Sequence, residues 1–274
     1  MFMQEINNTH KLFDKVITED LAQGYKLYAL MDRSHLINEI TEYDQEALFI
    51  GTRFKSAIEA SPLLISLKLD DTYVVESMMN EYLGILLLSK LSIEQVRETL
   101  NQYLEVDSEN LGSVYVRFYA PSVCLSLLNS EPELFYGFKV ICPQITRKQW
   151  VYCDLSKEEI KKRVISISDI TVQVMERYRL GAWLGLYERW QQKPSEELHR
   201  ASIVIESLIK NGLQNQALLE EWRGFLADNL AIIDRPEWNS LLNQSLDDMG
   251  LYESAIQLAM VVKQSDDFTV REKN

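Results

Sequence analysis

Short apolar runs alternate with helix-like segments along the first 155 residues of the chain. Apolar runs predict strands at 26–32, 47–51, 62–68, 83–89 and 113–119. Between several of these runs, as at 71–82 and 92–103, apolar residues recur at helical spacing. The run 83–89 is almost continuously apolar, which is typical of a parallel strand covered on both faces. The pattern therefore predicts an α/β domain with a mostly parallel sheet and flanking helices.

The pattern changes after Leu155, where strand signals stop and helical spacing continues. Helices are predicted near 169–192, 195–211, 214–230, 237–248 and 251–264. Gly212 and Gly250 are expected to end helices, because glycine adopts the left-handed conformation of a C-terminal cap. We therefore predict an α/β domain at 1–155 and an all-α domain at 156–274.

Local signals mark the ends of some elements. Ser92 and Gln95 have the spacing of a capping box, in which each side chain accepts a hydrogen bond from the other residue's backbone N–H. Pro121 lies where a helix over 121–129 would begin, and proline suits the first turn of a helix. Two further strand-like runs, near 133–141 and 149–155, are predicted to pair with each other and close the sheet.

The composition is that of a globular protein with a strong excess of acid. Hydrophobic residues make up 46% of the chain and charged residues 25%, and the formal net charge is −13. This charge disfavours nucleic acid and anionic membranes as partners and favours a basic one. The N-terminus shows no signal peptide, and Cys124, Cys142 and Cys153 follow no disulfide framework. We expect a soluble, cytoplasmic protein with no nucleic-acid or membrane partner.

Few segments carry a catalytic or metal-binding motif. The three histidines, His10, His35 and His199, share no metal-binding spacing, and no nucleotide-binding glycine loop is present. Ile50-Gly51-Thr52 is a possible phosphate-binding turn, although one glycine more often marks a tight turn. Cys124 lies in an apolar helical segment, which favours a packed cysteine over a reactive one. We therefore predict no metal, no cofactor and no enzymatic activity.

The stretch VYVRFYAPSV, residues 114–123, places an arginine inside an apolar run. Side chains alternate faces along a strand, so Tyr115, Arg117 and Tyr119 are expected to share one face. A buried guanidinium requires a carboxylate, and Asp32 at the end of the first predicted strand is the expected partner. The alternative is that Arg117 binds a carboxylate of a partner protein at the edge of the sheet.

The order of several motifs resembles one known family. The motifs are YALMD (28–32), ALFIGT (47–52), SPLLISL (61–67), GILLLSKLSIEQVRETLNQYLEV (84–106), VYVRFYAPSV (114–123) and W-x-x-x-D (150–154). In this order they are similar to the N-terminal domain of the type VI secretion effector adaptor–chaperones. The resemblance covers roughly residues 25 to 155, and the helical segment beyond matches only in character.

The resemblance implies a non-enzymatic role and a set of structural residues. Such adaptors bind a toxic effector in the cytoplasm of the producing bacterium and help to load it onto the spike protein of the secretion machine. The motif residues of this chain are Asp32, Arg117, Tyr119 and Pro121. Family members commonly carry aspartate before the proline, whereas this chain has Ala120, so the expected role of neutralising the arginine passes to Asp32.

The helical domain supplies candidates for partner binding, and other functions stay open. Trp222 and Trp238 lie among charged residues and, with Tyr252, are candidate contacts for the partner, with core packing as the alternative. A small-molecule enzyme would use the sheet edge near Asp32, Thr52 and Arg117. A third possibility is a helical scaffold that binds a partner helix without chaperone action.

Overall fold

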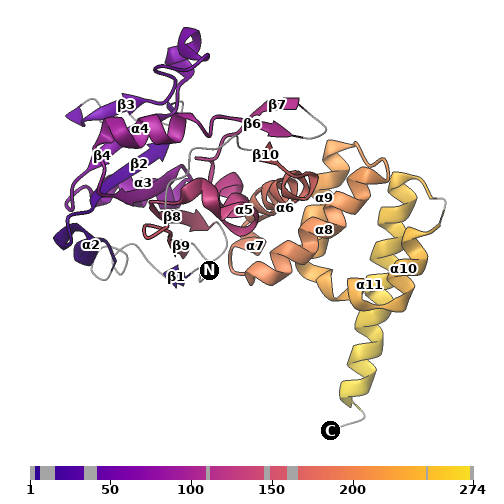
Figure 1. Ribbon diagram of the computed structural model, residues 1–274. Helices are drawn as coiled ribbons and strands as arrows, with labels where there is room; N and C mark the ends of the chain where they lie inside the picture. The colour runs from indigo at the N-terminus through magenta and orange to yellow at the C-terminus, as the bar shows by residue number, and fades with distance from the viewer. Residues whose placement is uncertain are drawn as a thin grey trace. The chain divides into compact units, whose positions relative to one another are not determined.

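A computed structural model shows a chain that divides into two compact units, Met1–Ala182 and Trp183–Asn274. The structure describes residues 4–6, 16–33, 42–108, 112–144, 149–158, 166–244 and 246–271. The first unit is built on β-sheet and the second is helical (Figure 1). The domain boundary predicted at residue 155 stays a prediction.

A seven-stranded sheet forms the centre of the first unit, in the spatial order β1-β9-β8-β5-β2-β4-β3. Its strands are β1 (Gln4–Ile6), β2 (Lys26–Met31), β3 (Gln45–Ala47), β4 (Leu63–Leu67), β5 (Ile85–Ser89), β8 (Lys139–Gln144) and β9 (Gln149–Asp154). Every neighbouring pair in this sheet is antiparallel. The predicted pairing of the runs near 133–141 and 149–155 is found as β8 with β9, in the register Lys139↔Asp154. The first run is a strand only from Lys139, because Pro132–Phe135 form a 3-10 helix, and β1 rather than this pair forms the edge of the sheet.

The prediction of a mostly parallel sheet is wrong. Strands β4 and β5 do run in the same direction and are joined by helix α3 (Thr72–Asn80), but β2 lies between them and is antiparallel to both. The predicted strand–helix–strand order of β4, α3 and β5 is therefore confirmed, while the sequence does not indicate that β2 lies between the two strands. A continuous apolar run reports that both faces of a strand are buried and does not report the direction of its neighbours.

Both faces of the sheet are covered by packed side chains. On β5, Ile85 and Leu87 face one hydrophobic core, while Leu86 and Leu88 face a second core on the opposite side. The first core also contains residues of α4 (Ile93–Asn101), α5 (Pro121–Ser130) and the 3-10 helix η5 (Pro132–Phe135). The second contains residues of α3 and Ile17, just before α2 (Thr18–Ala22). This burial on both faces explains the almost unbroken apolar run at 83–89.

Helix α4 begins as the sequence predicts. The Ser92 backbone N–H donates to Gln95 Oε1 at 2.9 Å, and the Gln95 backbone N–H donates to Ser92 Oγ at 3.4 Å. Ile93, Val96 and Leu100 of this helix are buried. The capping box is therefore confirmed, together with the apolar stripe that follows it.

A smaller sheet of three strands, in the order β10-β6-β7, belongs to the same unit. Strands β6 (Glu105–Ser108) and β7 (Gly112–Tyr115) form an antiparallel pair, and β10 (Ser166–Ile167) adds to β6 in parallel. Val106 and Ile167 are buried in the first hydrophobic core, so one face of this small sheet packs inward. Strand β7 pairs with β6 alone among the described strands.

One glycine is required by a close approach of backbone. Gly84, just before β5, has φ +55°, and a Cβ atom there would lie 2.4 Å from the carbonyl oxygen of Leu30. Any larger residue would clash with β2 and would also meet an unfavourable backbone conformation.

The second unit is a group of helices around an apolar core. Helix α6 (Asp169–Gly185) begins in the first unit and ends in the second. The others are α7 (Glu188–Gln191), α8 (Ser195–Lys210), α9 (Gln216–Asn229), the 3-10 helix η7 (Leu230–Asp234), α10 (Pro236–Leu242) and α11 (Asp248–Arg271). The helical character predicted for the C-terminal part is confirmed from Asp169 onward, whereas the strand β10 at Ser166–Ile167, inside the predicted all-α domain, was not predicted. No helix among the described residues is both apolar and long enough to cross a bilayer.

The two predicted helix-ending glycines differ in the structure. Gly212 follows α8 with φ +107°, as a C-terminal cap requires. Gly250 does not end a helix, because it lies in the first turn of α11, where its N–H donates to Asp247 Oδ1 at 2.7 Å. The sequence Asp247-Asp248-Met-Gly250 is thus a helix start, with Asp247 in the place of an N-terminal capping residue.

Candidate functional site

The structure brings Arg117 and Asp32 together, but outside the sheet. Strand β7 ends at Tyr115, and Arg117 lies in the turn that leads to α5. Its Nη2 atom is 2.5 Å from Asp32 Oδ2. The Arg117 side chain is 53% exposed and that of Asp32 is 22% exposed. The expected burial of the arginine within a strand is therefore wrong, and the ion pair is largely solvated.

Two tyrosines lie beside this ion pair. The hydroxyl groups of Tyr115 and Tyr119 are 3.0 Å apart and hydrogen-bonded to each other. Burial raises the pKa of Tyr115, and the hydrogen bond to Tyr119 raises it further. The guanidinium carbon of Arg117 lies 5.8 Å from the centroid of the Tyr119 ring. The Arg117 guanidinium thus contacts the Tyr119 ring, and the hydroxyl groups of Tyr115 and Tyr119 serve as each other's hydrogen-bond partners.

Pro121 opens helix α5, directly after the turn that carries Arg117. The N-cap residue is Ala120, and the helix has no side-chain cap. Pro121 is buried, and its carbonyl oxygen accepts a hydrogen bond from Cys142 Sγ at 3.5 Å. Burial raises the pKa of the Cys142 thiol well above its ordinary value, so this cysteine is held as a neutral donor. Because Ala120 has no side chain that could cap the helix, the start of α5 relies on Pro121 and on backbone hydrogen bonds.

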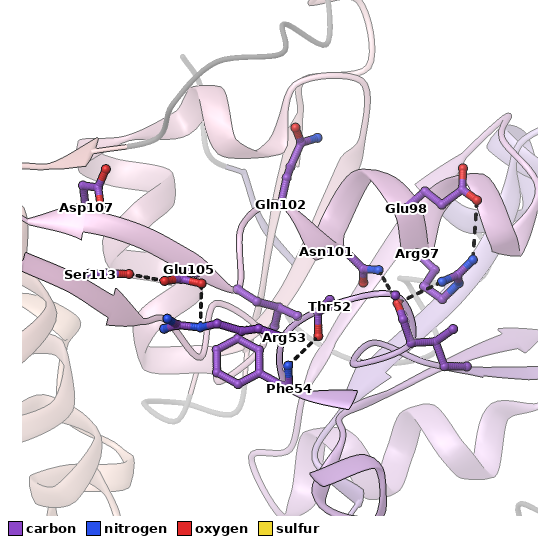
Figure 2. A pocket seen from close by; sticks show the side chains of 13 residues that line it. Thr52, Arg53, Phe54, Arg97, Glu98, Asn101, Gln102, Glu105, Asp107 and Ser113 are labelled. Carbon is purple, nitrogen blue, oxygen red and sulfur yellow. Dashed lines mark hydrogen bonds and ion pairs between the residues drawn. The ribbon is translucent and has the colours of Figure 1, made fainter. Parts of the chain in front are cut away.

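An open cleft of about 910 Å³ lies next to these residues in the first unit. Its walls come from the loop after β3, from the end of α4, and from β6 and β7 (Figure 2). The lining residues used below are Ile50, Thr52, Arg53, Phe54, Arg97, Asn101, Glu105, Asp107 and Ser113. Thr52, one of the residues that the enzyme alternative invoked, lines this cleft, whereas Asp32 and Arg117 are not among its lining residues.

The Ile50-Gly51-Thr52 turn on one wall is held by the protein's own donors. The carbonyl oxygen of Ile50 accepts from Arg97 Nη1 at 3.1 Å and from Asn101 Nδ2 at 2.8 Å. Thr52 Oγ1 donates to the Phe49 carbonyl at 2.9 Å and accepts from the Phe54 N–H at 3.1 Å. These donors are therefore engaged within the turn, which supports the tight-turn interpretation over a phosphate site.

The charged groups of the cleft are mostly paired with one another. Arg53 Nε lies 2.7 Å from Glu105 Oε2, and Ser113 Oγ donates to the other oxygen of the same carboxylate. Arg97 lies 3.3 Å from Glu46. Asp107 makes no hydrogen bond or ion pair with any described residue. Among the described residues, the cleft therefore offers a guest the exposed acid of Asp107, while its arginines are already neutralised.

An aromatic cluster joins the cleft to the arginine turn. Phe54 lies 5.3 Å from Phe49 and 5.2 Å from Tyr115 between ring centroids, and Phe49 lies 6.0 Å from Tyr115. Tyr115 in turn bonds to Tyr119, which contacts Arg117. The sequence motif around Arg117 therefore supports one wall of the cleft without lining it.

A buried lysine that sequence reasoning missed lies elsewhere in the first unit. Lys139 Nζ is 2.5 Å from Asp20 and 3.5 Å from Asp154, and its side chain is only 8% exposed. It also lies 4.4 Å from the ring centroid of Tyr25. Burial lowers the pKa of Lys139, but the bond to Asp20 and the neighbouring charges outweigh this and raise it above the ordinary value. A lysine held so firmly as a cation is a structural group and not a nucleophile.

The aromatic residues proposed as partner contacts form the core of the second unit. Trp222 is fully buried, and its ring lies 6.2 Å from Trp238, which is also buried, and 5.2 Å from Tyr252. Tyr252 is half-buried and donates to Glu221 Oε2 at 3.4 Å. The two tryptophans thus pack inside the unit, and only Tyr252 reaches its surface. Within the described residues no group of three or more potential metal ligands is found.

Comparison with known proteins gives one result. Residues 27–134 match the model of a family described as "Domain of unknown function (DUF4123)". The matched segment runs from β2 to η5 and contains Asp32, Arg117, Pro121 and the whole lining of the cleft. No curated protein and no solved structure matches the chain.

Proposed function

We propose that the protein is a non-enzymatic adaptor that binds a type VI secretion effector in the cytoplasm and helps to load it onto the spike protein. The observation that carries the proposal is the family match over residues 27–134, because this family is associated with type VI secretion effector adaptors. The match covers the same motifs, from YALMD to VYVRFYAPSV, on which the resemblance was recognised.

The chemistry of the described residues is in keeping with a binding role. The acids and arginines of the cleft neutralise each other, and the buried lysine is a fixed cation. An enzyme at the sheet edge would need Asp32, Thr52 and Arg117 to converge on one pocket, whereas only Thr52 lines the cleft. The net charge of −13 would steer a basic partner segment toward the surface.

The test combines purification with secretion. The tagged protein, expressed at its natural level in the producing bacterium, should co-purify with one toxin-like protein and with a spike protein. Deletion of its gene should abolish secretion of that effector while other effectors of the same machine are still secreted. Unchanged secretion of every effector after the deletion would refute the adaptor role.

A further inference from the structure

Strand β7 presents an open edge. The Val116 N–H donates to the Leu104 carbonyl at 3.0 Å, which sets the phase of the β6–β7 ladder. In an antiparallel pair the hydrogen-bonded positions alternate, so Val114 points its backbone groups toward β6. The backbone N–H and C=O groups of Ser113 and Tyr115 then point away from β6, toward the side where β7 has no neighbour.

These outward backbone groups have no partner in the described part of the chain. Gly112, Ser113 and Tyr115 are exposed, so the edge is open to a protein partner. Proteins usually protect such an edge with proline, a charged residue or a covering segment. The β7 sequence Gly-Ser-Val-Tyr carries no proline and no charge, and valine and tyrosine favour strands.

The same strand borders the cleft. Ser113 and Glu105 line it, as does Asp107, which lies directly across from Ser113 in the ladder (Figure 2). Residues that face each other across an antiparallel pair project from the same face of the sheet. A strand added beside β7 would therefore direct every second side chain to the face of the cleft, from which a long side chain could reach across Ser113 toward Asp107 on β6.

We propose that β7 and the adjoining cleft bind an extended segment of a partner polypeptide, which adds to β7 as a fourth strand and directs a basic side chain toward Asp107. Strand addition supplies main-chain hydrogen bonds, and the cleft supplies preference for the side chain. A second copy of this chain fits the edge less well, because its β7 carries no basic side chain for Asp107 and two chains of net charge −13 repel each other. The identity of the segment as part of an effector rests on the proposed function.

The first test uses a defined peptide and does not depend on any effector. The capped peptide acetyl-Thr-Val-Lys-Val-Thr-amide is titrated into the full chain while amide hydrogen exchange is followed. Binding should protect the Ser113 and Tyr115 amides. Ser113→Pro removes the outward N–H without breaking a bond to β6, and should weaken binding about tenfold, the value of roughly one lost hydrogen bond plus a steric clash.

Ser113→Ala is the matched control, because it removes the hydroxyl bond to Glu105 but keeps the N–H. It should bind the peptide within about twofold of the wild type. Circular dichroism and thermal melting of both variants establish that the fold is kept. Absence of peptide binding to the wild type, or equal binding by Ser113→Pro and Ser113→Ala, overturns the proposal.

The second test addresses the charge. Asp107→Asn should weaken binding of the lysine peptide by about threefold to tenfold at low salt, and less at high salt. Glu237→Gln, an equal charge change on an exposed residue of α10, is the control and should have no effect. A version of the peptide with glutamate in place of lysine should bind more weakly to the wild type and lose this difference in Asp107→Asn. Equal binding of the two peptides contradicts the role of Asp107.

The outcomes separate the two proposals. Failure of the wild type to recover an effector from its bacterium counts against the adaptor role, whatever the peptide result. Equal recovery of the effector by Ser113→Pro and the wild type counts against strand addition at β7 alone. A concentration-dependent dimer that Ser113→Pro abolishes would assign the edge to a second copy and would overturn the proposed occupant.

Discussion

Two ion pairs in the first unit show how differently similar charges act in one fold. Arg117 and Asp32 meet in a turn, where the arginine is 53% exposed. Lys139 meets Asp20 and Asp154 beneath the surface, where the lysine is 8% exposed. Water reaches the arginine of the first pair, whereas Lys139 and Asp20 are both less than 10% exposed and only Asp154, at 35%, meets solvent. We therefore expect the pair that is conspicuous in the sequence to be the less important for stability.

The largest effect is expected from Lys139→Ala. It leaves the buried carboxylate of Asp20 without its cation and should lower the free energy of unfolding by about 3–5 kcal/mol. Urea denaturation of the variant and the wild type measures this difference. Lys139→Met keeps most of the packing against Tyr25 and separates the loss of charge from the loss of volume. A loss below about 1 kcal/mol in Lys139→Ala would show that the site behaves like an exposed pair.

A smaller effect is expected from acid, through Asp154. Burial raises the pKa of Asp154, but hydrogen bonds from Ser156 and the charge of Lys139 outweigh this and lower it below its ordinary value. A carboxyl group with a lowered pKa in the folded state stabilises the protein fully above its ordinary pKa of about 3.9, and this contribution is lost as the pH falls through the lowered value. Unfolding curves of the wild type and Asp154→Asn between pH 2 and about 7 should therefore converge toward acid. A constant difference over this range would contradict the assignment.

The sequence predicts the positions of strands and helix caps better than it predicts strand direction and the burial of side chains. Strands β2, β4, β5 and β9 and the capping box at Ser92 follow from apolar runs and spacing, whereas β1 was not predicted and the strand predicted at 47–51 is mostly a turn after β3. The antiparallel order does not, because the insertion of β2 between β4 and β5 depends on long-range packing. An apolar run with a charge inside it, such as VYVRFYAPSV, suggests a buried ion in a strand, yet the chain turns after Tyr115 and releases Arg117 to solvent.

The sequence around Lys139 does contain an indication of its contact with Asp154. It lies in the run Gly137-Phe-Lys-Val-Ile, and the opposing strand of the predicted pair ends in Asp154. In the register of β8 and β9 these two residues face each other, so an antiparallel pairing would have suggested the contact. Asp20 lies far away in sequence, and no local pattern indicates that it completes the site. Similarly, the charged neighbours of Trp222 and Trp238 gave no indication that both rings are buried.

A smaller change still is expected from Arg117→Ala. The pair with Asp32 is partly exposed, so its loss should lower the free energy of unfolding by only about 0.2–1 kcal/mol. A double-mutant cycle with Asp32→Asn measures the coupling directly, and it should weaken in high salt. A decrease of about 3 kcal/mol or more in the free energy of unfolding would indicate that Arg117 behaves as a buried structural ion.

A change of similar size is expected in the outer part of the lysine site. Ser156 Oγ donates to Asp154 Oδ1 at 2.7 Å, and the Ser156 N–H donates to the same oxygen at 3.0 Å. Ser156→Ala removes the first bond and keeps the second, so it should cost about 0.5–1 kcal/mol at neutral pH, the net value of one hydrogen bond. Because this bond helps to lower the pKa of Asp154, the variant should lose less stability in acid than the wild type, and its loss should be complete at a higher pH. Tyr25→Phe is the matched control, since the Tyr25 hydroxyl donates to Ser156 Oγ at 3.0 Å without touching the carboxylate. If Tyr25→Phe and Ser156→Ala shift the acid transition equally, the effect comes from general loosening of the site and not from the bond to Asp154.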